Sequence, residues 1–189
     1  MRVFWTQGYA GASISDLTTA MGIASPSLYA AFGSKEGLYR EALALYMSTR
    51  GDTFQCALTL PTARGAIETL LRGAVLDFTS GEYPAGCMLV LTGTQTADMS
   101  PELAAEMCDQ RASGPAAFVT RLEQAVTEGE IAPGTDIKAV ADFYTTIHRG
   151  LTVSARGGAT YEELDSVVTS AMAAWGPLTT IRSEANAPT

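Results

Sequence analysis

The stretch from Gly8 to Leu38, GYAGASISDLTTAMGIASPSLYAAFGSKEGL, constrains the fold more than any other part of the chain. Glycine breakers, serine caps and one proline divide it into two short helices joined by a tight turn, with a third helix opening just after them. Two short helices at this spacing are typical of a helix-turn-helix that reads DNA. The segment therefore predicts a DNA-reading unit near the N-terminal end of a helical protein.

The start of each short helix carries its own signals. Ser13 is expected to cap the first helix, and Asp16 three residues later completes a pair that resembles a capping box. Gly22 suits the turn, because glycine tolerates a positive φ. Ser25 is expected to cap the second helix, with Pro26 at the first helical position, where its missing N–H has no cost.

The second short helix has one inward and one outward face. We expect Leu28, Ala31 and Phe32 to face the core. A short recognition helix can lie in the major groove, with residues near its N-terminus reaching base edges. The residues left for that role point outward: Ser27, Tyr29 and Ala30.

The motifs GYAGASISDL and MGIASPSLYAAFGSKEGLY resemble the DNA-binding domain of the TetR/AcrR family of transcriptional repressors. The similarity covers about Phe4 to Tyr46 and rests on the glycine-tyrosine pair, the serine cap, the LY-x-x-F core and the SKE tail. It implies an all-α fold, in which an N-terminal helix-turn-helix domain precedes a C-terminal helical ligand-binding and dimerisation domain.

The resemblance also implies which side chains approach double-stranded DNA. Tyr29 and Lys35 would hold phosphates, and Ser25, Pro26, Ser27 and Ala30 would lie nearest the bases. The whole set implied for DNA binding is Ser13, Ser25, Pro26, Ser27, Tyr29, Ala30 and Lys35.

The segment departs from the family pattern at two places. Ala31 stands where the family often has histidine or another polar residue, so one phosphate contact is expected to be absent. Met1 to Gln7 are shorter than the first helix and basic arm that such proteins usually carry, so the first helix is expected to be truncated. The alternative for the segment is a small helical subdomain without a nucleic-acid role, in which Tyr29 and Lys35 are ordinary surface residues.

The net charge of −8 is unusual for a DNA-binding protein, but it is unevenly distributed. Residues 1–50 hold four basic side chains against three acidic ones, a net charge of +1, which leaves −9 on the remainder. Because phosphate neutralisation supplies much of the affinity for DNA, a nearly neutral head predicts modest binding unless two heads act together.

The remaining composition excludes several classes of protein. No run reaches the roughly 18 apolar residues of a membrane helix, and no signal peptide is recognisable. Cys56, Cys87 and Cys108 lack metal-site spacing, which argues against a zinc site or a disulfide framework and favours a cytoplasmic protein. With a single histidine and no phosphate-binding loop, an enzyme is disfavoured, and no cofactor or metal is expected.

The domain boundaries are expected after residue 46 and after residue 182, which gives a helix-turn-helix domain at 1–46, a helical effector and dimerisation domain at 47–182 and a flexible tail at 183–189. Periodicity and breakers predict helices over 35–53, 63–80, 86–97, 136–156 and 160–175. Another begins at Ser100-Pro101 and is expected to bend or break near Gly114-Pro115.

The last two helices are expected to form an antiparallel hairpin around Gly157-Gly158. Similar proteins pair this hairpin with its twofold mate, which implies a homodimer that reads a palindromic operator. The alternative is that the apolar stripes pack the core of one chain, and we expect both, with different faces. The candidates for the dimer interface are Tyr144, His148, Leu151, Leu164, Val168, Met172 and Trp175.

The effector site is expected between the middle helices, in a mostly apolar pocket that takes a small apolar or aromatic molecule. For each candidate residue, plain core packing is the competing interpretation. The candidates are Met88, Thr92, Gln95, Met107, Phe118, Tyr144 and His148.

Together these features predict a ligand-responsive repressor that leaves its operator when the effector binds. The main alternative is a helical ligand-binding or protein-interaction dimer that has lost DNA binding. An enzyme built on a helical scaffold is the third and least favoured class.

Overall fold

The computed structural model describes residues 1–93 and 96–180, and no strand occurs in those ranges. This confirms the prediction of an all-α fold. The effector candidate Gln95 and the predicted tail at 183–189 lie outside the described residues. The helices are α1 (Arg2–Gly11), α2 (Ile14–Met21), α3 (Ser25–Phe32), α4 (Lys35–Leu58), α5 (Ala63–Thr79), α6 (Met88–Gly93), α7 (Pro101–Thr127), α8 (Ile137–Arg156), α9 (Tyr161–Ala173) and α10 (Trp175–Thr179).

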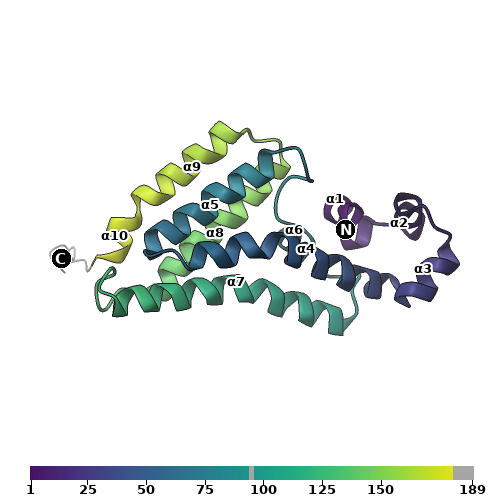
Figure 1. The fold of residues 1–189 in the computed structure, drawn as a ribbon, viewed down its shortest axis with the longest axis horizontal. Helices are drawn as coiled ribbons and strands as arrows, with labels where there is room; N and C mark the ends of the chain where they lie inside the picture. The colour runs from purple at the N-terminus through teal and green to yellow at the C-terminus, as the bar shows by residue number, and fades with distance from the viewer. Residues whose placement is uncertain (94–95, 181–189) are drawn as a thin grey trace, which may run out of the picture.

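Helices α1 to α3 form a small head at one end of the molecule, and α4 leaves this head and runs through the middle into the helical body (Figure 1). The predicted boundary after residue 46 therefore falls inside one continuous helix. None of the described helices is apolar over enough of its length to cross a membrane.

The head shares its apolar core with the nearest part of the body. Phe4 and Leu28 of the head and Tyr39 of α4 are fully buried, and Leu103 and Met107 of α7 belong to the same cluster. Side chains from α6 also enter it. The head is consequently packed onto the body rather than joined to it by a flexible linker.

The core of the body lies among α5, α7, α8 and α9. Arg121 of α7 is buried beside the link between α4 and α5, where it donates to the carbonyl oxygens of Leu60 at 3.2 Å and Pro61 at 3.1 Å. Its guanidinium also lies 3.4 Å from the Glu128 carboxylate. A buried arginine needs such partners, and here they fix the α4–α5 turn against α7.

Three helix predictions need correction. The helix expected to begin at residue 86 begins at Met88, because Gly86 has a φ of 83° and lies outside α6, and residues 94–95 of the expected range lie outside the described residues. α7 is continuous through Gly114-Pro115; the buried side chains of Met107 and Phe118, on either side of the proline, hold both halves of this helix against the core. α4 runs to Leu58, five residues beyond its expected end at 53.

Gly37 is the position where we expect a single methyl group to disturb the head. It lies in the first turn of α4, and a Cβ there would overlap the carbonyl oxygen of Phe32 at the end of α3. Because backbone cannot yield as a side chain can, Gly37→Ala should lower the stability by about 1–3 kcal/mol, measured by thermal unfolding followed by circular dichroism.

Gly51 is the matched control in the same helix, since a Cβ there meets no atom within 4 Å. Gly51→Ala should raise stability by about 0.5–1 kcal/mol, as expected for alanine replacing glycine inside a helix. Equal melting temperatures for the two variants would contradict the close approach of α3 to Gly37.

Candidate functional site

The first short helix of the head has the capping box that its sequence predicts. Ser13 Oγ accepts a hydrogen bond from Asp16 N at 3.0 Å, and the Asp16 carboxylate accepts one from Ser13 N at 3.1 Å. The bond from the Ser13 hydroxyl, followed by the one from its backbone, lowers the pKa of Asp16. Gly22 then closes the helix with a φ of 67°, as expected. The angle between α2 and α3 is therefore set by local chemistry.

α3 presents one exposed face. Leu28 is its single buried residue, and Phe32 is half-buried on the same side. Two expectations are wrong in detail. Ala24, not Ser25, is the N-cap, so that Ser25 is the first helical residue and its side chain makes no cap. Ala31 is exposed, because the anchoring face of this short helix is centred on Leu28 and Phe32.

Lys35 is the first residue of α4 and lies beside the exposed face of α3. Its Nζ is 4.5 Å from the centroid of the Tyr9 ring. Burial lowers the pKa of Lys35, and the nearby charge of Asp98 partly offsets this. No carboxylate in the described ranges lies within ion-pair distance of Lys35, whereas Arg40 and Arg50 both pair with acids.

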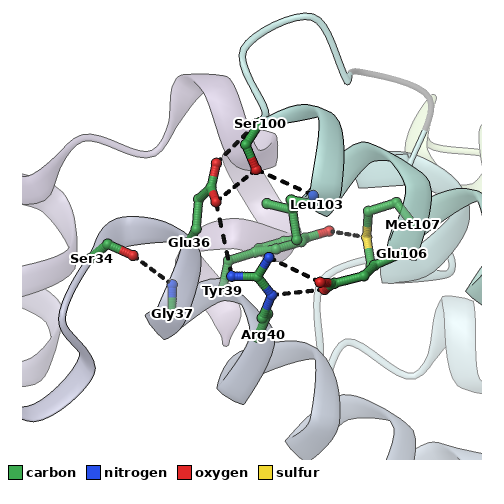
Figure 2. Close-up of polar contacts among 9 residues, drawn as sticks. All are labelled: Ser34, Glu36, Gly37, Tyr39, Arg40, Ser100, Leu103, Glu106 and Met107. Atoms are coloured by element: carbon green, nitrogen blue, oxygen red, sulfur yellow. Dashed lines mark hydrogen bonds and ion pairs between the residues drawn. The ribbon is translucent and has the colours of Figure 1, made fainter.

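A polar clamp of four residues joins the first turns of α4 to the start of α7 (Figure 2). The Glu36 carboxylate accepts hydrogen bonds from Ser100 N and Ser100 Oγ, both at 2.9 Å. Arg40 lies between Glu36 and Glu106 and donates to Glu106 at 2.7 and 3.0 Å. Because Ser100 is also the N-cap of α7, the orientation of the head is tied to that helix.

A cavity of about 600 Å³ lies in the body, next to the head. α4, α5, α7 and α8 contribute most of its wall, and α1 contributes Trp5. This size and a mostly apolar wall with a few polar groups are typical of small-molecule sites. The aromatic side chains in the wall are Trp5, Tyr46, Phe54, Phe78, Phe118 and His148, and the charged ones are Arg50, Asp77, Arg111 and Arg149.

Trp5 links the cavity to the head. Its Nε1 donates to the Gly86 carbonyl oxygen at 2.9 Å, and its ring packs edge-on against Tyr46 at 5.0 Å. The preceding residue, Phe4, packs edge-on against Tyr39 in the core of the head. One short helix thus contacts both the DNA-reading unit and the wall of the cavity.

Two family models together match most of the chain. Residues 1–42 match the model for bacterial regulatory proteins of the tetR family, and residues 61–171 match the tetracyclin repressor-like C-terminal domain. The chain belongs to the TetR family. The family resemblance and the two-part architecture inferred from the sequence are thereby confirmed, and this is a family of bacterial transcriptional regulators.

Several relatives match over nearly the whole chain. The HTH-type transcriptional repressor ComR of Escherichia coli (strain K12) is 31% identical over 180 residues, which are 94% of this chain and 86% of ComR. The repressor BdcR of the same organism is 29% identical over 90% of this chain and 81% of its own length. A cysteine mutant of the TetR family regulator CifR, solved with 26-base-pair operator DNA, is 42% identical with a TM-score of 0.87, and the match covers 92% of each chain.

The residues predicted to contact DNA lie on α3, at the N-cap of α2 and at the first residue of α4. All are exposed except Lys35, which is half-buried against Tyr9. This placement leaves them accessible to a partner, and their roles in a TetR head stay predictions. The set is Ser13, Ser25, Pro26, Ser27, Tyr29, Ala30 and Lys35.

The predicted effector residues are divided between the cavity and the core. Phe118 and His148 line the cavity. Thr92 and Met107 instead contact the buried Tyr39 hydroxyl, which lies 2.6 Å from Thr92 Oγ1 and 3.3 Å from Met107 Sδ, and Met88 is buried in the same cluster. Tyr144 is buried in the body, where its hydroxyl donates to the Ala171 carbonyl oxygen at 3.2 Å. These four residues lie outside the cavity wall, and their role in effector binding stays a prediction.

Sequence reasoning missed most of the cavity wall. On α4 the missed residues Tyr46, Arg50 and Phe54 recur every four residues, which is a helical stripe. The spacing of this stripe is visible in the sequence, but spacing alone does not distinguish a cavity wall from a packed core. Arg111 on α7 and Arg149 on α8 gave no local signal.

Six of the seven residues predicted for the dimer interface are buried in the core of a single chain, and the interface itself stays a prediction. His148 is the exception and lines the cavity. The exposed side of the α8–α9 hairpin instead carries Phe143, Ile147 and Val167, with Val167 44% exposed. The six buried residues are Tyr144, Leu151, Leu164, Val168, Met172 and Trp175.

His148 is neutral at neutral pH. Burial, and then the charge of Arg149, lower the pKa of His148 to about 4 from its usual 6.5. The folded protein therefore binds fewer protons than the unfolded chain between these values. Stability from this residue is complete above about pH 6.5 and is lost as the pH falls toward 4.

We therefore expect wild-type protein to lose more stability between pH 7 and about pH 5 than His148→Gln does. Glutamine keeps a polar side chain at the wall but cannot bind the proton. Urea unfolding at both pH values measures the difference, and all other titrating groups cancel in the comparison. Identical losses for the two proteins would mean that His148 is as solvated as in the unfolded chain.

Proposed function

We propose that this TetR family protein is a homodimeric repressor that binds a palindromic operator through α3. A small effector in the cavity among α4, α5, α7 and α8 releases it. The observation that carries this proposal is the shared helix α1, because Phe4 packs in the DNA-reading head while Trp5 lines the cavity. The operator complex of the related CifR supports the DNA-binding part.

Ligand binding can reach the head along α4. This helix begins with Lys35 beside α3 and carries Tyr46, Arg50 and Phe54 into the cavity wall. A ligand that favours one position of these side chains favours one position of the whole helix, and so one spacing of the two heads. Coupling free energies of about 1–3 kcal/mol are typical, which would weaken operator binding by about 5–150-fold.

A dimer supplies what one head lacks. Residues 1–50 carry a net charge of only +1, and Arg40 and Arg50 are engaged by acids. Two heads held about one turn of DNA apart double the number of phosphate and base contacts. The exposed apolar residues of the α8–α9 hairpin favour that surface for pairing.

Lys35 tests the DNA-binding part. Lys35→Gln should weaken binding to all DNA sequences about equally, because a phosphate contact carries no sequence information. It should also reduce the slope of log affinity against log salt by about one for each head. Fluorescence anisotropy with DNA from upstream of the protein's own gene measures both quantities.

Lys138 is the control, because it is the other lysine of the chain and pairs with Asp142 on α8, away from the head. Lys138→Gln should leave affinity and salt slope unchanged. If the wild-type protein shows no salt-sensitive, sequence-selective binding to any fragment of that region, the alternative of a ligand-binding dimer without DNA binding replaces the proposal.

Val167 tests the dimer. Val167→Arg places a charge in the proposed apolar contact and should convert the dimer to monomers in sedimentation velocity, with loss of tight operator binding. Leu76→Arg on α5, at a leucine that is 57% exposed, is the matched control and should stay dimeric. A dimeric Val167→Arg protein would exclude this face as the interface.

A further inference from the structure

The wall of the cavity carries a net positive charge, although the chain as a whole is acidic. Its wall holds Arg50, Arg111 and Arg149 but a single carboxylate, that of Asp77, while the chain as a whole has a net charge of −8. His148 adds no charge at neutral pH. The wall is therefore complementary to a negatively charged molecule.

Arg50 is already neutralised. Its guanidinium lies 3.1 Å from the Asp77 carboxylate and 3.9 Å from the centroid of the Tyr83 ring. This arrangement holds Arg50 in place from both sides and leaves the other two arginines to account for the charge of the wall.

Arg111 and Arg149 form no ion pair with any acid in the described parts of the chain. Arg111 is half-buried on α7, where its stem packs over Gly93 and its Nε donates to the Met107 carbonyl oxygen at 3.2 Å. Arg149 is exposed at the rim of the cavity on α8. Both can offer the remaining guanidinium N–H groups to a bound anion.

Thr145 supplies an independent observation. It lines the same cavity, one helical turn before Arg149 on α8. Its Oγ1 is buried and has no hydrogen-bond partner among the described residues. Because buried hydroxyl groups are normally paired, an unpaired one in a cavity wall indicates a ligand atom that completes it.

We propose that the effector is an apolar molecule with one carboxylate, bound by Arg111 and Arg149 with a hydrogen bond from Thr145. Its apolar part would lie against the aromatic wall formed by Trp5, Phe54 and Phe118. Planar guanidinium groups match the two oxygens of a carboxylate, and the apolar surroundings strengthen the attraction. This inference rests on the proposed function, since it takes the cavity as the effector site.

Arg111 is also connected to α4 through Met107. Its Nε donates to the carbonyl oxygen of Met107, one turn earlier on α7, and Met107 Sδ accepts a hydrogen bond from the Tyr39 hydroxyl of α4. The next residue toward the start of α7, Glu106, pairs with Arg40. A carboxylate that binds Arg111 can therefore shift the segment of α7 that contacts α4.

The experiment compares matched ligands by isothermal titration below their micelle concentrations. The panel contains decanoate, decanol, decylamine and decyl phosphate, together with 2-naphthoate and its primary alcohol. We expect each carboxylate to bind at least about tenfold tighter than its alcohol, as charge-assisted hydrogen bonds imply. Decylamine should bind weakest, and tighter binding of decyl phosphate than of decanoate would overturn the assignment to a carboxylate.

Variants locate the effect. Arg111→Gln, Arg149→Gln and Thr145→Val should each reduce the ratio of acid to alcohol affinity, whereas Arg111→Lys should retain part of it. Alcohol binding within each variant reports an intact cavity, so a folding defect cannot imitate the result. Arg64→Gln is the control, because Arg64 pairs with Glu68 on α5 outside the cavity wall, and its ratio should not change.

Equal affinities for acid and alcohol, no binding by either carboxylate, or ratios unchanged in all three variants would overturn the proposal. Operator release by the same ligands separates this outcome from failure of the proposed function. If acids and alcohols both release the operator, the cavity is the effector site but the effector needs no carboxylate. If carboxylates bind in a way that depends on the two arginines but do not release the operator, the carboxylate site is correct and the proposed release mechanism is wrong.

Discussion

The buried ring of Tyr39 is the contact on which the rest of the structure depends. It is fully buried at the junction of head and body, edge-on to Phe4 at 5.1 Å and to Tyr9 at 5.2 Å. Its hydroxyl lies between Thr92 and Met107. Burial raises the pKa of Tyr39, so the phenol keeps its proton and can donate within this apolar site. Four helices, α1, α4, α6 and α7, therefore meet around one side chain.

The attachment of the head has a second, weaker part. The clamp of Glu36, Arg40, Ser100 and Glu106 is formed at the surface, where water and salt screen ion pairs and reduce their contribution to stability. The aromatic junction, in contrast, excludes water. A head held tightly at one point and loosely at another can change its angle without detaching from the body, which is the property that a switch with two operator affinities requires.

The parts of the fold that follow from local chemistry could be predicted from the sequence. The Ser13–Asp16 box, the glycine turn at residue 22 and the cap at Ser34 each involve residues within a few positions of one another. The predicted N-cap of α3, Ser25, is one residue too late. Serine is favoured at the N-cap and proline in the first turn, and Pro26 is compatible with a helix that begins at either position. Here the backbone, and not the residue type, decides.

The cavity and the pairing surface could not be predicted in the same way, because both depend on which side of each helix its neighbours cover. Periodicity correctly identified a buried stripe on α8 and α9, but it cannot tell burial within a chain from burial between chains. Leu151 and Val168 are buried in the core of the chain itself. Ile147 and Val167 are equally apolar residue types but lie outside that core, on the face proposed for pairing, so residue type alone does not separate the two groups.

The distribution of arginine follows from the same packing. Arg40 lies in the segment that resembles a DNA-binding domain and Arg50 follows it on α4, yet they pair with Glu106 and Asp77 of the body. Arg40 thereby joins the first turns of α4 to α7, and Arg50 joins α4 to α5, so the charge of both is engaged within the protein instead of in phosphate binding. Arg2 and Lys35 are the basic residues of the first 50 that have no acidic partner among the described residues, and in the proposed dimer tight operator binding depends on two heads at a fixed spacing. Under the proposed mechanism a change in this spacing weakens operator binding, so a small rotation of α4 would be enough for release.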